Sequence, residues 1–191
     1  MTAPPPSPIA ASDKVLRELR DGVGVITFNR PECHNAIDDE LRAQWREALA
    51  WAADTPAVKA VLLQGAGPSF CSGRDTRALG QRDAGVSHRA YVKAAQDMRW
   101  HQVQMRKPLV AAVQGHAVGA GAELALGADW RIAAEDLRFG LPEVNFGLVA
   151  DTGATAMLAA LVGPARAKWL ERSSSAKPRW RRVTRRSPES G

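Results

Sequence analysis

The sequence contains only two cysteines and no uninterrupted apolar run long enough to cross a membrane. Cys33 and Cys71 lack the spacing of a metal site or of a disulfide framework, which argues against a disulfide-stabilised secreted scaffold and favours a reducing compartment. The longest apolar stretch, residues 109–126, is interrupted by a glutamine, a histidine and a glutamate. A membrane span is therefore disfavoured, and we expect a cytoplasmic protein with no membrane partner.

The two ends of the chain are poor in residues that build a core. Residues 1–13 are rich in proline and serine and have neither the basic nor the apolar segment of a secretory signal. After about Trp169 aliphatic residues almost disappear. We predict a disordered arm over 1–13, one core domain over 14–170 and a disordered basic tail over 171–191. The abrupt change also suggests a shifted reading frame or a gene model that ends wrongly.

Positive charge is concentrated at the C-terminal end. The chain carries +6 in all, of which residues 171–191 carry +5, leaving +1 for everything before them. A basic protein can bind nucleic acid, but basic residues without a folded platform are typical of a solvated tail. Nucleic-acid binding therefore ranks last among the functions considered, and strongly salt-dependent affinity would be its signature.

The hydrophobic pattern predicts an α/β protein. With 191 residues, 45% of them hydrophobic, the chain can bury one core. Short apolar, β-branched runs predict strands at residues 15–19, 23–28, 58–65, 109–115, 129–134 and 137–140. A helix capped by Asp38 should bury one stripe, formed by Leu41, Trp45, Ala48, Leu49 and Ala52. Further helices are expected over 87–106 and from 119 through 126. The last helix is expected over 154–161, and Gly163 and Pro164 should end it.

Two glutamates occupy segments that are otherwise small or apolar. Glu123 lies in "GHAVGAGAELAL" (115–126), where glycines allow close approach to a helix N-terminus. The alternative is a glycine-rich helix start packed on a strand, with Glu123 paired to an arginine. Glu143 follows Pro142 in an irregular apolar stretch where no surface helix is expected. Two such carboxylates can divide acid and base roles, and the turn at 72–75 offers further backbone amides.

Four stretches resemble the crotonase, or enoyl-CoA hydratase/isomerase, superfamily. They occur in the family's order within residues 15–170. The stretches are "NRPECHNAID" (29–38), "VLLQGAGPSFCSGRD" (61–75), "VAAVQGHAVGAGAELALGADWRIAA" (110–134) and "FGLPEVNFGLVADTGATAMLAALVGPARAKWL" (139–170). The resemblance implies a crotonase-like spiral of β-β-α units that binds an acyl-CoA thioester. The family's usual C-terminal helical segment, which follows the last stretch, has no counterpart here.

The resemblance also assigns roles to residues. The main-chain N–H groups of Arg74 and Ala120 would form the oxyanion hole. Glu143 would exchange the proton at C2, and Glu123 would orient or activate water for C3. The implied substrate and CoA contacts are Cys33, Asn35, Ala36, Ser72, Gly73, Arg74, Asp75, Thr76, Arg77, Gly119 and Ala120. The resemblance implies no metal and no cofactor beyond the CoA of the substrate. It also implies that the protein forms a homotrimer or a dimer of trimers.

Enoyl-CoA hydratase is the leading function, because both acidic positions are kept. An isomerase of the same superfamily and a truncated, non-catalytic acyl-CoA binder are the alternatives. Other polar residues receive structural roles: packing or surface for His34 and His116, a turn cap for Asp75, and a cap on the following helix for Asp151. Cys71 is expected to be a buried hydrophobe.

Overall fold

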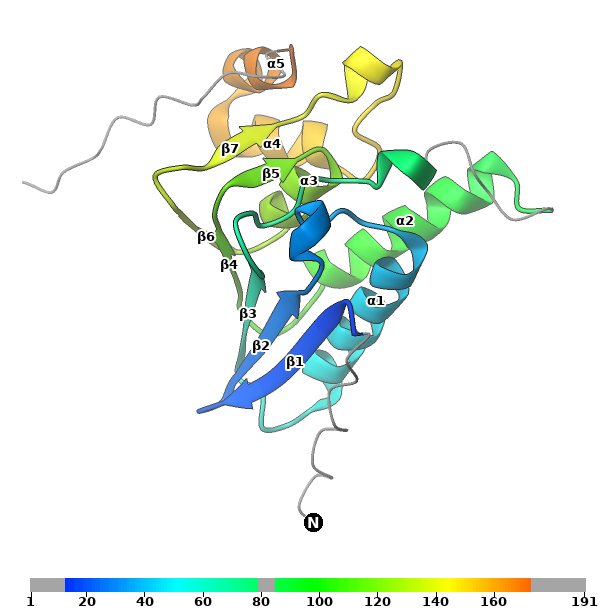
Figure 1. Cartoon of the computed structure of the whole chain (residues 1–191). Coiled ribbons are helices and arrows are strands. Elements are labelled where there is room, and N and C mark those ends of the chain that lie inside the picture. The colour runs from blue at the N-terminus through cyan, green and yellow to red at the C-terminus, as the bar shows by residue number, and fades with distance from the viewer. Residues whose placement is uncertain (1–12, 79–84, 173–191) are drawn as a thin grey trace, which may run out of the picture.

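The computed structural model describes residues 13–78 and 85–172 (Figure 1). The predicted N-terminal arm and basic tail lie almost wholly outside these ranges, so the domain limits at 13 and 171 stay predictions. Among the described residues, no helix has both the length and the apolar character that a membrane crossing requires.

The main sheet has five strands in the order β1-β2-β3-β4-β6. β1 and β2 form an antiparallel hairpin, and the remaining pairs are parallel. β5 and β7 form a separate two-stranded parallel sheet. The strands are β1 (Val15–Arg20), β2 (Val23–Phe28), β3 (Ala60–Gly65), β4 (Leu109–Val113), β5 (His116–Val118), β6 (Trp130–Ala133) and β7 (Arg138–Gly140).

Five α-helices and three short 3-10 helices are found in the described residues. The α-helices are α1 (Asp39–Asp54), α2 (His88–Val103), α3 (Ala120–Leu126), α4 (Ala154–Val162) and α5 (Pro164–Arg172). The 3-10 helices are η1 (Pro31–Cys33), η2 (Thr76–Ala78) and η3 (Glu143–Phe146). Asp38 caps α1 as predicted, because its Oδ1 accepts the Leu41 N–H at 2.8 Å.

Two apolar clusters hold the fold together. In the larger one, α1 and α2 pack beside the main sheet (Figure 1). The buried residues of α1 are the five of the predicted stripe, so its 3.6-residue periodicity did set the buried face. The second cluster joins α3, β7, α4 and α5. The α/β class is confirmed.

Three local predictions were wrong or incomplete. The strand β5 was missed, because three residues beside a glycine carry too little periodicity to be recognised. The helix over 154–161 is not the last, since α5 starts at Pro164; proline is tolerated in the first turn of a helix, where its missing N–H costs nothing. Glu143 begins a 3-10 turn, η3, rather than an irregular segment.

Candidate active site

Two segments far apart in sequence cross at the centre of the candidate site. Residues 69–74 follow β3, and residues 115–123 contain β5 and the start of α3; together they are called the site floor below. Cys71 and Ala117 form a parallel β-bridge. The Cys71 N–H donates to the His116 carbonyl at 2.8 Å, and the Val118 N–H donates to the Cys71 carbonyl at 3.1 Å. Backbone hydrogen bonds therefore fix the position of the site floor.

Two glycines allow the segments of the floor to approach this closely. A Cβ on Gly121 would lie 2.1 Å from the Cys71 carbonyl oxygen. One on Gly73, which has φ +93°, would lie 2.5 Å from the Val118 carbonyl oxygen and 3.5 Å from the Ala120 nitrogen. Because neither backbone could tolerate a side chain here, glycine is required at both positions. The chain around residues 73–74 thus lies beside the chain around 119–120.

The structure brings together the two amides that the sequence assigned to an oxyanion hole. Ala120 is the first residue of α3, where a helix leaves its N–H without an intrahelical acceptor. Over residues 13–78 and 85–172, neither the Arg74 N–H nor the Ala120 N–H donates a hydrogen bond. The neighbouring Gly119 N–H is used, donating to the Gly140 carbonyl at 2.9 Å. Two adjacent free donors can polarise a carbonyl; their catalytic role stays a prediction.

Glu123, the last residue of the floor, is almost completely buried. Only 2% of the residue is exposed, and its Oε1 accepts the N–H groups of Thr152 at 3.0 Å and Ala154 at 3.3 Å. These bonds satisfy the N-terminus of α4. The sequence predicted that Asp151 with Gly153 caps this helix, and Gly153 is indeed the N-cap residue, but Asp151 supplies no side-chain cap in the described structure; the buried carboxylate of Glu123 supplies the acceptor instead.

Arg99 of α2 is a buried cation that interacts electrostatically with Glu123. The sequence analysis did not identify it. It is 5% exposed and donates through Nη1 to Gln102, which in turn donates to the Leu124 carbonyl at 2.9 Å. Burial lowers the pKa of Arg99 to about 10, and the Glu123 charge opposes that shift. The sequence analysis left open that Glu123 pairs with an arginine. Among the described residues no arginine forms a direct ion pair with Glu123, so Arg99 interacts with it only through its charge at longer range.

Glu143 lies against Gly119, the residue that precedes α3. A Cβ on Gly119 would be 3.1 Å from Glu143 Oε1, so the carboxylate stands directly against the N-terminus of α3. Its Oε2 is buried and has no hydrogen-bond partner in the part of the chain that the structure describes. Burial raises the pKa of Glu143 to about 6, and the charges of Glu123 and Asp151 add to the shift. A carboxyl group of this kind can hold or release a proton near neutral pH.

The loop that the sequence assigned to the coenzyme is braced from inside by Asn35. This residue is fully buried; its amide donates to the Ala66 carbonyl at 2.9 Å and the Ser69 carbonyl at 2.7 Å. Its side chain therefore supports the loop, and the coenzyme contact expected for it stays a prediction. His34 and Asn35 have φ of +52° and +56°, a left-handed pair that these bonds hold in place.

A charge cluster ties the same loop to the end of the floor. The Asp75 carboxylate lies 2.8 Å from Arg77 and 3.5 Å from Arg30, and its Oδ1 also accepts the Arg77 N–H at 3.1 Å, the turn cap that the sequence predicted. The hydrogen bond from Arg77 holds the pKa of Asp75 well below its usual range. Arg77 also reaches Cys33 Sγ at 3.5 Å. The predicted coenzyme contacts Cys33, Asp75 and Arg77 are thus brought together.

Ser69 links two histidines, a connection that the sequence did not reveal. Its buried Oγ lies 3.0 Å from His34 Nδ1 and 3.1 Å from His116 Nδ1, and it accepts the His116 N–H at 3.2 Å. His34 is exposed and His116 is half-buried, and the packing or surface role expected for them stays a prediction. Burial lowers the pKa of His116, and the neighbouring His34 lowers it further. In the described ranges, no three His, Cys, Asp or Glu side chains are grouped closely enough to hold a metal ion.

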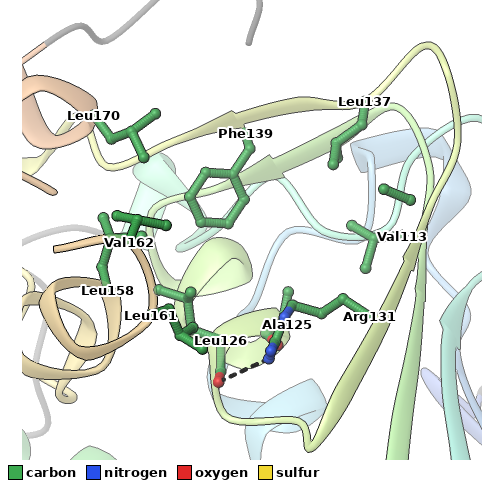
Figure 2. Close-up of a pocket in the computed structure, with 11 residues that line it drawn as sticks. Val113, Ala125, Leu126, Arg131, Leu137, Phe139, Leu158, Leu161, Val162 and Leu170 are labelled. Atoms are coloured by element: carbon green, nitrogen blue, oxygen red, sulfur yellow. Dashed lines mark hydrogen bonds between the residues drawn. The ribbon is translucent and has the colours of Figure 1, made fainter. Parts of the chain in front are cut away.

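A cavity of about 300 Å³ opens at the far end of α3 (Figure 2). Its wall is apolar except for Arg131, and Figure 2 shows Phe139 of β7 between Leu170 of α5 and Leu137. Neither glutamate lines it. Cys71 lies elsewhere in the core, fully buried as predicted, and burial raises the pKa of its thiol to about 12.

Comparison with known proteins gives one consistent family. The sequence model of the family described as "Enoyl-CoA hydratase/isomerase" matches residues 18–171. The chain is 35% identical over 161 residues to a crotonyl-CoA hydratase of Syntrophomonas wolfei, covering 84% of this chain and 62% of that protein. It is 36% identical over 162 residues to the 1,2-epoxyphenylacetyl-CoA isomerase of Escherichia coli, covering 82% and 61%.

Solved structures agree with these relatives. The enoyl-CoA hydratase of Thermoplasma volcanium superposes with a TM-score of 0.78 at 30% identity, covering 85% of this chain and 64% of that one. The crotonase-like fold expected from the sequence is therefore confirmed. The chain spans about three fifths of the length of the curated relatives it matches.

Proposed function

Since the chain belongs to the enoyl-CoA hydratase/isomerase family, we propose that it adds water across the 2,3 double bond of a trans-2-enoyl-CoA thioester. The observation that carries the proposal is the placement of two carboxylates, Glu123 and Glu143, at the site floor beside two unused backbone amides. Hydration requires one group that takes a proton from water and a second group that delivers a proton to carbon. Two carboxylates can share these roles.

The amides act on the thioester oxygen. The N–H groups of Arg74 and Ala120 donate to the thioester carbonyl, which becomes an enolate-like oxyanion as the water oxygen bonds to C3. Donors held by the crossing of two backbone segments need no reorganisation when this charge develops. Glycine at 73 and 121 is what permits the crossing, so the binding of the oxyanion depends on these two positions.

The carboxylates move the protons. Glu123 accepts one proton from the attacking water, whose hydroxyl group is left on C3. Glu143, with its pKa raised to about 6, delivers its proton to C2 as the enolate collapses. One proton then returns from Glu123 to Glu143 through solvent, which restores both groups and balances the addition of one water molecule. A pKa near 6 suits a group that must be regenerated at neutral pH.

Crotonyl-CoA hydration, followed by loss of the enoyl-thioester absorbance, tests this function. Glu123→Gln and Glu143→Gln should each lower kcat by at least about a hundredfold, the usual contribution of a positioned acid or base. Glu47→Gln, on an exposed position of α1, is the matched control and should keep wild-type turnover. Turnover that survives in either site variant would overturn the two-carboxylate mechanism.

An isomerase is the second candidate, supported by the Escherichia coli isomerase among the relatives. One carboxylate shuttling a proton between C2 and C4 is sufficient for double-bond migration. A 3-enoyl-CoA substrate separates the two functions: migration without hydration of crotonyl-CoA, abolished by one glutamate substitution only, would favour the isomerase.

A non-catalytic acyl-CoA binder is the third candidate, because the grouping of the predicted coenzyme contacts Cys33, Asp75 and Arg77 suits binding without requiring proton transfer. It predicts binding of a CoA thioester without turnover of either substrate. For the catalytic protein we further propose a cytoplasmic homotrimer or dimer of trimers that uses no cofactor beyond the substrate's CoA. Exposed apolar side chains such as Trp130, Ile132 and Phe146 suit a contact between subunits, and light scattering would measure the assembly.

A further inference from the structure

The side chain of Arg74 leaves the site floor on a different side from its neighbour Asp75. Arg74 pairs with Ile37 in a parallel β-bridge, and successive side chains of extended chain point to opposite faces. The contacts agree: the Asp75 carboxylate meets Arg77 and Arg30, whereas the Arg74 guanidinium lies over the ring of Tyr91 in α2, 4.4 Å from its centroid.

Arg74 has an aromatic partner but no anionic one. Over the described residues, no carboxylate lies within 4.0 Å of its guanidinium. Arg42 also lies over the Tyr91 ring, at 4.8 Å, but its charge is paired with Asp39 at 2.6 Å. Stacking on Tyr91 orients the Arg74 guanidinium while leaving its N–H groups available. A half-buried cation held in this way is suited to bind an anion supplied by a ligand.

Tyr91 belongs to a helix that also contacts the loop beside Glu123. About one and a half turns further along α2, the Gln96 amide donates to the Asp151 carbonyl at 2.8 Å, and the next residue, Thr152, donates its N–H to Glu123. The helix therefore runs from Arg74 to the loop that holds Glu123. The predicted coenzyme contacts Cys33 and Arg77 lie on the Asp75 side instead.

We propose, on the basis of the hydratase function above, that Arg74 is a specificity-determining residue that binds a carboxylate at the distal end of the acyl chain. Its backbone N–H would serve the thioester carbonyl, and its guanidinium would form a two-point ion pair with the second carboxylate, the arrangement that arginine favours. The substrate class is then the CoA thioester of a dicarboxylic acid rather than of a simple fatty acid.

Binding of unreactive saturated thioesters tests this assignment without requiring turnover. Isothermal titration calorimetry would compare glutaryl-CoA with pentanoyl-CoA, and adipyl-CoA with hexanoyl-CoA, pairs that differ by a terminal carboxylate in place of a methyl group. The full chain should bind the carboxylated member of one pair about tenfold more tightly, the worth of a charged hydrogen bond. Arg74→Gln, which keeps the backbone N–H, should bring that ratio close to one.

Arg42→Gln is the matched control, because it removes a stacked guanidinium that already has a carboxylate partner; the ratio should stay within about twofold of wild type. Absence of a preference in the full chain would overturn the proposal, as would a preference that persists in the Arg74→Gln variant. An equal loss of affinity for free CoA would show that Arg74 binds a coenzyme phosphate, which also overturns it. Preference without hydration of either crotonyl-CoA or glutaconyl-CoA, its counterpart with a terminal carboxylate, would leave this inference standing and reject the hydratase. Hydration without preference would do the reverse.

Discussion

Glu123 and Glu143 belong to the same candidate site but are held in different ways. Glu123 is 2% exposed, and two backbone N–H groups fix its Oε1. Glu143 is half-buried on a 3-10 turn, and its Oε2 has no partner in the ranges that the structure describes. The floor around Glu123 is built by backbone contacts that tolerate no side chain, whereas the segment around Glu143 is exposed at Val144 and Phe146. The fold therefore holds the Glu123 carboxylate by backbone hydrogen bonds, whereas among the described residues one oxygen of Glu143 is buried without such a bond.

The sharpest test of a rigid floor is Gly121→Ala. The new Cβ would overlap the Cys71 carbonyl, and a backbone atom held by hydrogen bonds cannot move away cheaply. We expect the free energy of unfolding to fall by about 3 kcal/mol, measured by chemical denaturation, with loss of turnover. Gly147→Ala is the control: nothing lies within 4 Å of its Cβ position, and only its φ of +68° opposes alanine, for about 1 kcal/mol. Equal costs would show that the floor can adjust.

The second test separates the two duties of Glu123. Glu123→Ala removes the acceptor for the Thr152 and Ala154 N–H groups and should lower the free energy of unfolding by about 2 kcal/mol. Glu123→Gln keeps an acceptor oxygen and should cost less than half as much, while turnover is lost in both. If both variants lose the same stability, the hydrogen bonds to α4 do not contribute as described.

Removing the Ser69 hydroxyl, which also belongs to the site floor, should lower the free energy of unfolding by less than the two changes above. Ser69→Ala leaves the His34 and His116 rings without their shared partner, and we expect a loss of about 1 kcal/mol in unfolding free energy. Ser72→Ala, whose hydroxyl makes a longer bond of 3.3 Å to the Cys33 carbonyl, is the control. A greater loss for Ser72→Ala would contradict the importance of the histidine link.

Glu143 should make the free energy of unfolding depend on pH. Its folded pKa of about 6 exceeds its ordinary value of 4.5, so its stabilising effect is fully present below about pH 4.5 and is lost as pH rises through 6. Relative to Glu143→Gln, the wild type should therefore become less stable as the pH rises from about 4.5 to about 7.5, by an amount that denaturation at several pH values would give. A difference that does not change over this range would show that burial leaves the carboxyl unperturbed.

Much of the framework followed from local patterns. The apolar stripe of α1 and its Asp38 cap are interactions within one helix, so spacing alone indicated them. The two glutamates stood out because carboxylates are rare among small apolar residues. Neither observation required knowledge of which distant segments meet.

Other features could not be inferred in this way. The bond from Glu123 to the start of α4 joins residues 29 positions apart, and without it Asp151 was the natural choice of cap. The short strand β5 exists because β7 pairs with it, and α5 begins directly after α4 because proline can open a helix. Each of these depends on contacts between segments, which a local pattern does not contain.

The sequence by itself determined the α/β class, the helix faces and the two carboxylates, since periodicity and residue type act over a few neighbouring residues. The motifs also carried the family resemblance that the comparisons confirmed. Only the tertiary structure decided that glycine backbones at 73 and 121 cross without side chains and that Arg74 stacks on Tyr91. It also decided that, among the described residues, the buried Oε2 of Glu143 has no hydrogen-bond partner. The physical reason is that burial and approach distance are set by the packing of segments distant in the chain.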